Sequence, residues 1–271
     1  MDSSILSRRA FYRSLRNDDF TKTKFSQIVP DREGLYLKKK VFLGYTDISA
    51  AGSRALLGIS AKTISCDLDI PELGTSELIC RPSTAAMDIP LLPIQIMHCK
   101  YEEVIIDAII FKFSLIVINT SLPPSKCHLV ADKIVNLCSE SEIERLVVLT
   151  TLKLRIPEKK LAPLYENSFN TRSLTTSPSL PDDTKVHDSF LNVLIQMVQL
   201  QGIPCNIMTA PGHSAFNSVP STDDNSLQAI QEFHQFIGGW TRLKFDEEVC
   251  LSLEFGRSKK IRRAGTLFMF S

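Results

Sequence analysis

The clearest hydrophobic pattern of the chain is a pair of apolar runs separated by a polar stretch and an amphipathic segment. Residues 146–150 and 203–208 form short apolar runs, which are typical of strands buried on both faces. Between them, residues 186–201 place their apolar side chains on one wide helical stripe, and Gly202 follows at the position of a helix C-cap. This pattern predicts a β-α-β unit with parallel strands and a right-handed crossover.

A second unit of the same kind precedes the first and shares its first strand. Residues 115–118 are an apolar run, and residues 128–139 carry apolar side chains on a broad helical face. Pro123 and Pro124 stand where the first turn of that helix is expected. The two units together predict an α/β fold: three layers, with a mostly parallel sheet and helices on both of its faces.

The flanking segments predict additional strands and one more helix. Residues 61–70 alternate between apolar and polar up to Pro71, as a half-buried strand does, and residues 94–99 begin in the same way. Residues 103–119 predict a hairpin or two successive strands, of which residues 113–118 are the more deeply buried part.

Towards the C-terminus, a helix is predicted from the capping segment 223–226 to a stop at Gly238-Gly239. Residues 243–255 fit a last helix or a last strand equally well. The polar stretches 159–184 and 211–224 predict long loops, and loops of such length are usually functional or disordered.

Charge divides the chain into three parts. Residues 1–40 hold ten basic and five acidic side chains without a sustained period, which predicts a flexible basic arm. Residues 41–255 form the single α/β domain, and residues 256–271 form a tail with five basic and no acidic side chains. The formal net charge is only +1, so the whole molecule gives no electrostatic reason to expect nucleic acid or a membrane as a partner.

Cysteine usage indicates a reducing compartment. None of the seven cysteines forms a CxxC pair, and most lie inside apolar runs, where they are expected to act as small core residues. Residues 1–9 lack the apolar block of a signal peptide, and the most apolar stretch, 104–118, is too short for a membrane span. We expect a cytoplasmic protein, with the nucleus as a second compartment, in which the Asn119-Thr120-Ser121 sequon stays unglycosylated.

A search for catalytic or cofactor motifs yields little. GxxxxGK[ST] and GxGxxG are absent, so no nucleotide cofactor is expected, and no cysteine and histidine spacing suits a metal. Gly212-His213-Ser214 lacks the second glycine of a nucleophile elbow, and a solvated loop histidine is favoured over a general base at His213. A protein without enzymatic activity is therefore predicted.

Two other functions stay open at this point. The first is an enzyme of doubly wound, nucleoside-phosphorylase-like architecture with a site in the loops after Thr150 and Met208, where open α/β sheets bind ligands. The second is a nucleic-acid adaptor that works through the basic ends, which the neutral body disfavours.

Residues 105–255 resemble the proteasome-assembly chaperone family, specifically the first subunit of its heterodimeric pair. The resemblance is carried by the order and spacing of the strand at 146–151, the helix at 187–200, the strand running into 206–212 and the helix at 228–240 followed by residues 245–250. It implies a non-catalytic chaperone that pairs with a second, related chaperone subunit and binds α subunits of the 20S proteasome during ring assembly.

The C-terminus fits the same resemblance. Family members of this type end in a hydrophobic residue, an aromatic residue, usually Tyr, and any last residue; here these positions are Met269, Phe270 and Ser271. The resemblance implies that these residues enter a pocket between α subunits, where the terminal carboxylate pairs with a lysine. Residues 256–266 would be the mobile tether of this anchor. The alternative for the apolar end is a final strand packed on the domain.

Overall fold

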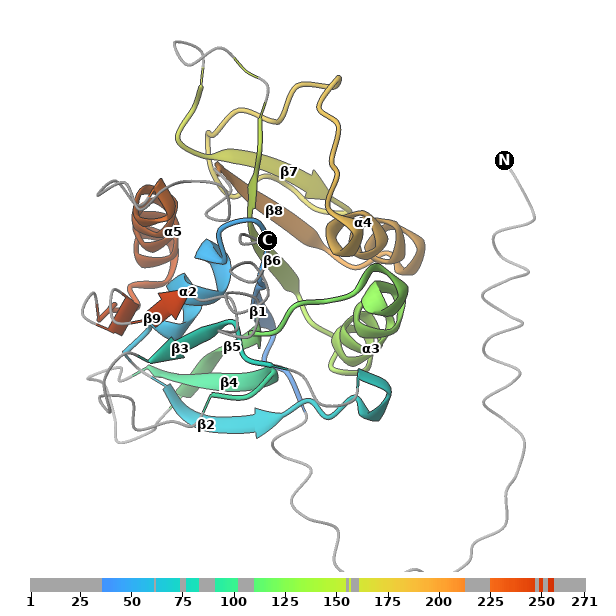
Figure 1. Ribbon diagram of the computed structural model, residues 1–271, viewed down its shortest axis with the longest axis vertical. Coiled ribbons are helices and arrows are strands. Elements are labelled where there is room, and N and C mark those ends of the chain that lie inside the picture. The colour runs from blue at the N-terminus through green and yellow to red at the C-terminus, as the bar shows by residue number, and fades with distance from the viewer. Residues whose placement is uncertain are drawn as a thin grey trace, which may run out of the picture. The chain divides into compact units, whose positions relative to one another are not determined.

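A seven-stranded sheet with helices on both faces forms the framework of the computed structural model (Figure 1). The strand order is β2-β4-β5-β1-β6-β8-β7. The structure describes residues 36–60, 62–73, 77–82, 91–101, 110–154, 156, 161–212, 225–246, 249–250 and 253–255. The predicted arm up to residue 35 and the predicted tail 256–271 lie outside these residues.

The four central strands of the sheet, β5, β1, β6 and β8, run parallel. Antiparallel strands flank them, because β4 pairs with β5, β2 pairs with β4, and β7 pairs with β8. The strands span β1 (Lys40–Gly44), β2 (Lys62–Asp67), β4 (Ile94–Tyr101), β5 (Ile110–Ile118), β6 (Arg145–Leu152), β7 (Tyr165–Phe169) and β8 (Cys205–Pro211).

Two helices cover each face of the sheet. Core side chains of α3 and α4 pack on one face, and those of α2 and α5 on the other (Figure 1). A separate two-stranded sheet joins β3 to β9. The bounds are α2 (Ala51–Leu57), η2 (Pro71–Leu73), β3 (Cys80–Pro82), η3 (Pro124–Lys126), α3 (Cys127–Glu140), α4 (Ser189–Gln201), α5 (Asn225–Thr241) and β9 (Leu253–Phe255). The predicted three-layer α/β fold is confirmed.

Both predicted β-α-β units are present, each with one difference. The unit β6-α4-β8 joins neighbouring strands, but its connection also contains β7. The unit β5-α3-β6 passes over β1, which lies between its two strands. The sequence did not predict β1 as a strand, although Val41, Phe42 and Leu43 are fully buried at the centre of the sheet. A strand this short shows too few apolar positions to be separated from the basic residues before it.

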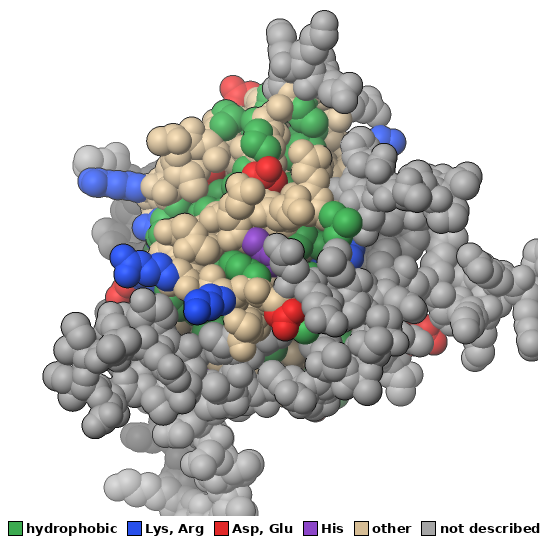
Figure 2. Space-filling view, turned by 90° about the vertical axis from the view of Figure 1, so that its left-hand side faces the viewer, with side chains coloured by type: hydrophobic (Ala, Val, Ile, Leu, Met, Phe, Trp, Pro, Cys, Tyr) green, Lys and Arg blue, Asp and Glu red, His purple; other side chains and the backbone are tan. Residues whose placement is uncertain are grey.

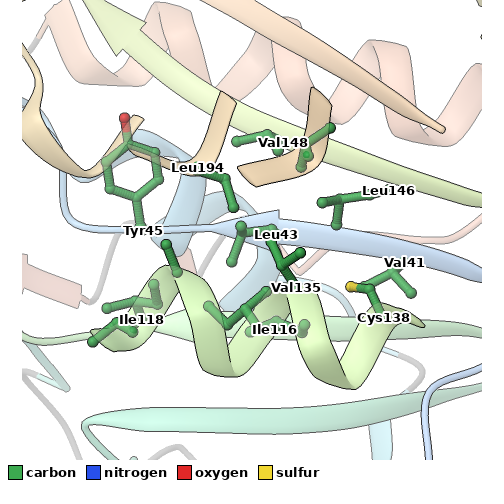
Figure 3. Packing of buried hydrophobic residues seen from close by; sticks show 14 of the residues in the cluster. Val41, Leu43, Tyr45, Ile116, Ile118, Val135, Cys138, Leu146, Val148 and Leu194 are labelled. Atoms are coloured by element: carbon green, nitrogen blue, oxygen red, sulfur yellow. The ribbon is translucent and has the colours of Figure 1, made fainter. Parts of the chain in front are cut away.

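Successive side chains of β1 point to opposite faces of the sheet, so the strand contributes to both layers of the core. Val41 and Leu43 face the α3–α4 layer, and Phe42 faces the α2–α5 layer. Figure 3 shows the first of these layers, in which side chains from three parallel strands meet those of the two helices. Its labelled members are Val41, Leu43, Tyr45, Ile116, Ile118, Val135, Cys138, Leu146, Val148 and Leu194.

The predicted stop of the last long helix at Gly238-Gly239 is wrong. Helix α5 continues through both glycines to Thr241, and the backbone turns left-handed only at Arg242, with φ 61°. Trp240 explains the continuation: its ring meets the ring of Phe42 edge-on at 5.5 Å between centroids. Packing of one large aromatic on the core outweighs the helix-breaking tendency of two glycines.

The predicted polar loop at 159–184 contains the edge strand β7 and is held by one buried carboxylate. Oε1 of Glu166 accepts hydrogen bonds from the Leu174 amide (2.6 Å) and from the Asn206 side chain (2.7 Å). Oε2 accepts bonds from the Thr175 amide (2.8 Å) and hydroxyl (2.7 Å). The amide of Glu166 bonds the carbonyl of Pro178 at 2.9 Å, so the loop covers part of the outer edge of β7.

We expect Glu166→Ala to release this loop from the sheet. Two backbone amides and one hydroxyl lose their acceptor, and each unpaired buried group costs about 1–3 kcal/mol, so amide exchange at Leu174 and Thr175 should be at least about tenfold faster. Hydrogen exchange read by mass spectrometry measures this. Asp182→Ala, an exposed change in the same loop, is the control. Unchanged exchange at Leu174 in Glu166→Ala would show that another contact holds the loop.

The ends of α4, the segment 243–255 and the sequon at Asn119 can also be compared with the predictions. Asp188 N-caps α4, with its carboxylate accepting the Leu191 amide at 2.8 Å, and Gly202 ends the helix at φ 68°. Residues 243–255 hold strand β9 at their end. Asn119, the first residue of the sequon, is fully buried. No helix within the described ranges has the length and hydrophobicity that a membrane crossing requires.

Candidate functional site

The predicted anchor residues Met269, Phe270 and Ser271 lie outside the described residues, but the point from which their tail departs is described. Strand β9 is the last described element, and it pairs antiparallel with β3, with Phe255 opposite Cys80. Sixteen residues follow Phe255. The pairing therefore places Phe255, the last residue before the predicted tail, beside β3.

The ligand-binding edge of an α/β sheet is the second place to examine. Open sheets bind ligands outside the carboxyl ends of their strands, where neighbouring strands continue to opposite faces. Here β1 continues into α2 on one face, while its neighbour β5 continues into α3 on the other, and its neighbour β6 leads through β7 to α4 on that same face. The carboxyl ends of β1, β5 and β6 thus form the switch point that an enzyme of this architecture would use.

Asp47, just beyond β1, occupies this switch point and is 7% exposed. Its Oδ1 accepts hydrogen bonds from the amides of Ser49 (3.1 Å) and Ala50 (2.9 Å). Its Oδ2 accepts bonds from the Thr151 amide and from the Thr150 hydroxyl (3.3 Å). One carboxylate thereby joins the loop before α2 to the end of β6, and it supports Ala50 in a left-handed conformation with φ 52°.

Tyr45 extends the same network to α4. Its hydroxyl pairs with that of Thr150 at 2.8 Å, and its ring lies 5.0 Å from the ring of Phe190, centroid to centroid. Burial raises the pKa of Tyr45 well above its usual value, and the nearby carboxylates of Asp188 and Asp47 raise it further. The phenol is therefore neutral, and it acts as a packed hydrogen-bonding group between the two layers.

Burial raises the pKa of the Asp47 carboxyl to about 6, against the lowering effect of the hydrogen bonds from Thr151 and Ser49. A carboxyl with such a pKa suits general acid–base chemistry when a substrate can reach it. Both oxygens of Asp47, however, are occupied by groups of the protein itself. In the described part of this edge, the switch point is filled by internal hydrogen bonds.

The enzyme alternative named the loops after Thr150 and Met208. Both of these residues are fully buried, and the hydroxyl of Thr150 is bonded to Tyr45 and Asp47. The candidate base His213 and its neighbour Ser214 lie outside the described residues. The described geometry thus assigns Thr150 a structural role.

Asn119 forms a second connection at the carboxyl edge, at the end of β5. Its Oδ1 accepts the Cys80 amide at 2.7 Å, and its Nδ2 donates to the Cys80 carbonyl at 3.0 Å. The Asn119 carbonyl also accepts the amide of Ile79 at 3.0 Å. These bonds attach β3 to the main sheet.

Among the described histidines and cysteines, His234 and Cys250 form a close pair, with Nε2 3.6 Å from Sγ. No group of three metal-binding side chains occurs among the residues that the structure describes. His98 is buried, with Nδ1 2.9 Å from the Ser114 hydroxyl, and His234 stacks on Phe245 at 3.9 Å between ring centroids. Burial raises the pKa of the Cys80 and Cys138 thiols to about 12, as the expectation of unreactive core cysteines requires.

The sequence analysis missed Tyr45, Asp47 and Asn119. A signal for Asp47 was available, because an Asp two positions before Ser49 at the end of a strand favours an Asx-turn into a helix. Asn119 entered the sequence analysis only as part of a sequon that was expected to stay unglycosylated. Its actual partner, Cys80, is 39 residues away in the chain, and no local pattern connects the two.

Comparison with known proteins supports the fold. No protein-family model matches the sequence, and no curated relative does. Among solved structures, Pyrococcus furiosus PbaA, described as an archaeal homolog of proteasome-assembly chaperone, aligns with a TM-score of 0.54 at 13% identity, covering 80% of this chain and 83% of PbaA.

Two further structures are similar at the same level. Pyrococcus furiosus PbaB, described as an archaeal proteasome activator, gives a TM-score of 0.51 at 11% identity over 88% of this chain and 94% of PbaB. A Thermoplasma acidophilum protein of unknown function gives 0.53 at 12% identity over 85% and 90% of the two chains. At such identities the likeness establishes the shared three-layer fold.

Proposed function

We propose that this chain is a non-catalytic chaperone for assembly of the α-ring of the 20S proteasome, the first subunit of a heterodimer with a related chaperone. The observation that carries the proposal is the C-terminus: the end Met269-Phe270-Ser271, on a basic tail of 16 residues that starts at a defined strand. The fold shared with PbaA and PbaB, whose descriptions name proteasome assembly and activation, supports it.

The described switch point supports the absence of catalysis. Its one buried carboxyl, Asp47, is saturated by backbone amides and by Thr150, so it has no acceptor position left for a substrate proton. In a chaperone the hydrogen bonds of Asp47 would make the domain rigid, because they hold the β1–α2 loop on the sheet. The body then acts as a stable carrier for its tail.

The tail binds as a short anchor on a tether. Met269 and Phe270 would fill an apolar pocket between two α subunits, and the carboxylate of Ser271 would pair with a lysine of that pocket. Such an anchor is weak alone and becomes effective once the body docks and raises its local concentration. Occupied pockets would then order the α subunits and exclude other ring-binding proteins.

The exposed side chains of the α/β domain are of mixed type on the α5 side. In Figure 2, the described hydrophobic side chains of this face lie in several groups separated by polar ones, and basic side chains gather along one margin.

Among the described residues, the large hydrophobic side chains that are exposed are Tyr36 (52%) and Leu200 (85%). Leu200 lies on α4, a helix without a charged residue, which is the composition found in interface cores.

Co-purification with a tagged chain from its native cells tests the proposal. Wild type should retain a related chaperone subunit and proteasome α subunits, whereas a version lacking Met269 to Ser271 should keep the former and recover at least about tenfold fewer α subunits. Quantitative mass spectrometry measures both. Phe270→Ala should behave like the truncation, and Phe270→Tyr should raise the recovery by adding a phenolic hydrogen bond.

Two outcomes would contradict the proposal. If neither wild type nor truncation brings α subunits, the protein does not act on the proteasome, and the loops at the switch point should be assayed for enzymatic activity. If both bring them equally, binding occurs through the body alone. An unchanged melting temperature of the truncated chain is the control for folding.

A further inference from the structure

Asn119 makes contacts with β3, the strand that pairs with β9. The residue is fully buried at the carboxyl end of β5. Its side-chain amide bonds both backbone groups of Cys80, at 2.7 and 3.0 Å, in the manner of a neighbouring strand. The main chain on either side adds the Ile79–Asn119 bond at 3.0 Å and a bridge between Leu78 and Thr120.

Strand β3 therefore has two neighbours. The amide and carbonyl of Cys80 are directed to Asn119, and β9 pairs along β3 in the register Cys80↔Phe255, Arg81↔Glu254 and Pro82↔Leu253. In an antiparallel ladder the bonding groups of successive residues point to opposite edges, so one strand can serve both neighbours. β9 pairs with β3, and β3 is held on the main sheet by the side chain of Asn119 together with the main-chain contacts of residues 78 and 79.

We propose that Asn119 is a positioning residue for the C-terminal anchor: by holding β3, it fixes the point at the carboxyl edge of the sheet from which the tail departs. This inference rests on the proposed function, since it concerns the same tail. The residue need not touch the partner. Its role is to set the origin of the tether.

The position at which the tether begins matters because the tether is short. Sixteen residues after Phe255 span at most about 55 Å when fully extended. Without the β3–β9 pairing, the last held residue would be Cys250, which is 2% exposed and whose carbonyl accepts Arg54 Nη2 at 3.4 Å. The tether would then have 21 residues, counted from 251 to 271, and would start from a mobile segment.

The first test measures the mechanical link itself. In Asn119→Ala, the backbone amide and carbonyl of Cys80 lose their partners, so amide exchange in both β3 and β9 should become at least about tenfold faster. Exchange in β6 and β8 should stay within about twofold. Asn206→Ala, which removes an equally buried asparagine at the other side of the sheet, is the matched control and should leave β9 unchanged. Unaltered exchange in β9 of Asn119→Ala overturns the inference.

The second test asks whether the position at which the tail begins affects binding. It combines Asn119→Ala with the truncation of Met269 to Ser271 in the co-purification experiment. In the full-length chain, Asn119→Ala should lower the recovery of α subunits by at least about 1.5-fold, the factor expected from lengthening the tether from 16 to 21 residues. In the chain lacking Met269 to Ser271, the same substitution should have no further effect. Equal losses in both backgrounds would mean general destabilisation and overturn the inference.

A second variant keeps the test decisive if Asn119→Ala folds poorly. Glu254→Pro removes a backbone N–H from β9 and leaves Asn119 and the core untouched, and it should give the same tail-dependent loss. Recovery equal to wild type in Glu254→Pro would overturn the inference. The failures of the two proposals are distinguishable, because a truncation without effect contradicts the proposed function, whereas an effective truncation with ineffective Asn119 and Glu254 variants contradicts only the positioning role.

Discussion

Asp47→Ala is expected to lower the free energy of unfolding by at least about 3 kcal/mol. The substitution leaves the amides of Ser49, Ala50 and Thr151 without an acceptor in the interior, and each unpaired buried group costs about 1–3 kcal/mol. Guanidinium unfolding followed by the fluorescence of Trp240, the single tryptophan of the chain, measures the loss.

The control for this prediction is Asp183→Ala, which removes an exposed carboxylate and should change the stability by no more than about 0.5 kcal/mol. A loss of less than 1 kcal/mol in Asp47→Ala would mean that water or a rearranged loop satisfies the three amides. It would also reopen the switch point as a site that a ligand could enter.

The same carboxyl predicts a dependence of stability on pH. Its pKa is about 6 in the folded protein and about 3.9 in the unfolded chain, so the folded state binds the proton more tightly. The destabilising effect of the buried charge is therefore complete above pH 6 and is relieved as the pH falls towards 4, by up to about 3 kcal/mol. The difference between wild type and Asp47→Asn, plotted against pH, isolates this contribution, and parallel curves would refute the raised pKa.

Gly52→Ala is expected to destabilise the fold by about 2–4 kcal/mol, because α2 lies directly on the sheet. A Cβ at Gly52 would lie 2.4 Å from the carbonyl oxygen of Leu149, and one at Gly44 would lie 2.4 Å from that of Gly52. Both contacts are with backbone, which cannot rotate away as a flexible side chain can. The helix would have to lift off the strands, and fully buried neighbours such as Leu56 and Leu57 would lose packing.

Gly239→Ala provides a matched comparison within the same layer. Nothing lies within 4 Å of a Cβ at this position of α5, so the alanine should stabilise the helix by up to about 1 kcal/mol. Thermal unfolding of the two variants beside wild type should move the midpoint in opposite directions. If Gly52→Ala melts within about 1 °C of wild type, α2 does not lie as close to the sheet as described.

The elements predicted correctly are those whose own residues carry a strong period. The helices α3 and α4 and the strands β6 and β8 have enough apolar positions to be recognised locally, and α4 also carries its caps, Asp188 and Gly202. Strand β7 was missed because Tyr-Glu-Asn-Ser-Phe is polar and becomes a strand only by pairing with β8. The end of α5 was misplaced because Trp240 packs on Phe42, which is distant in sequence.

For the candidate site, the difference between what the sequence predicts and what only the structure shows is larger than for the fold. The composition of the tail and its last three residues can be read directly from the chain. Asp47 and Thr150 are 103 positions apart, and Asn119 and Cys80 are 39 apart, so no local pattern could connect either pair.

The sequence by itself therefore determined the α/β class, the two crossover units and the absence of nucleotide motifs, since each depends on periodicity or on adjacent residues. The anchor at residues 269–271 stays a prediction. Only the tertiary structure decided that β1 is the central strand, that Asp47 fills the switch point, and that β3 lies between Asn119 and β9. These features depend on hydrogen bonds and packing between segments that meet only when the sheet has formed.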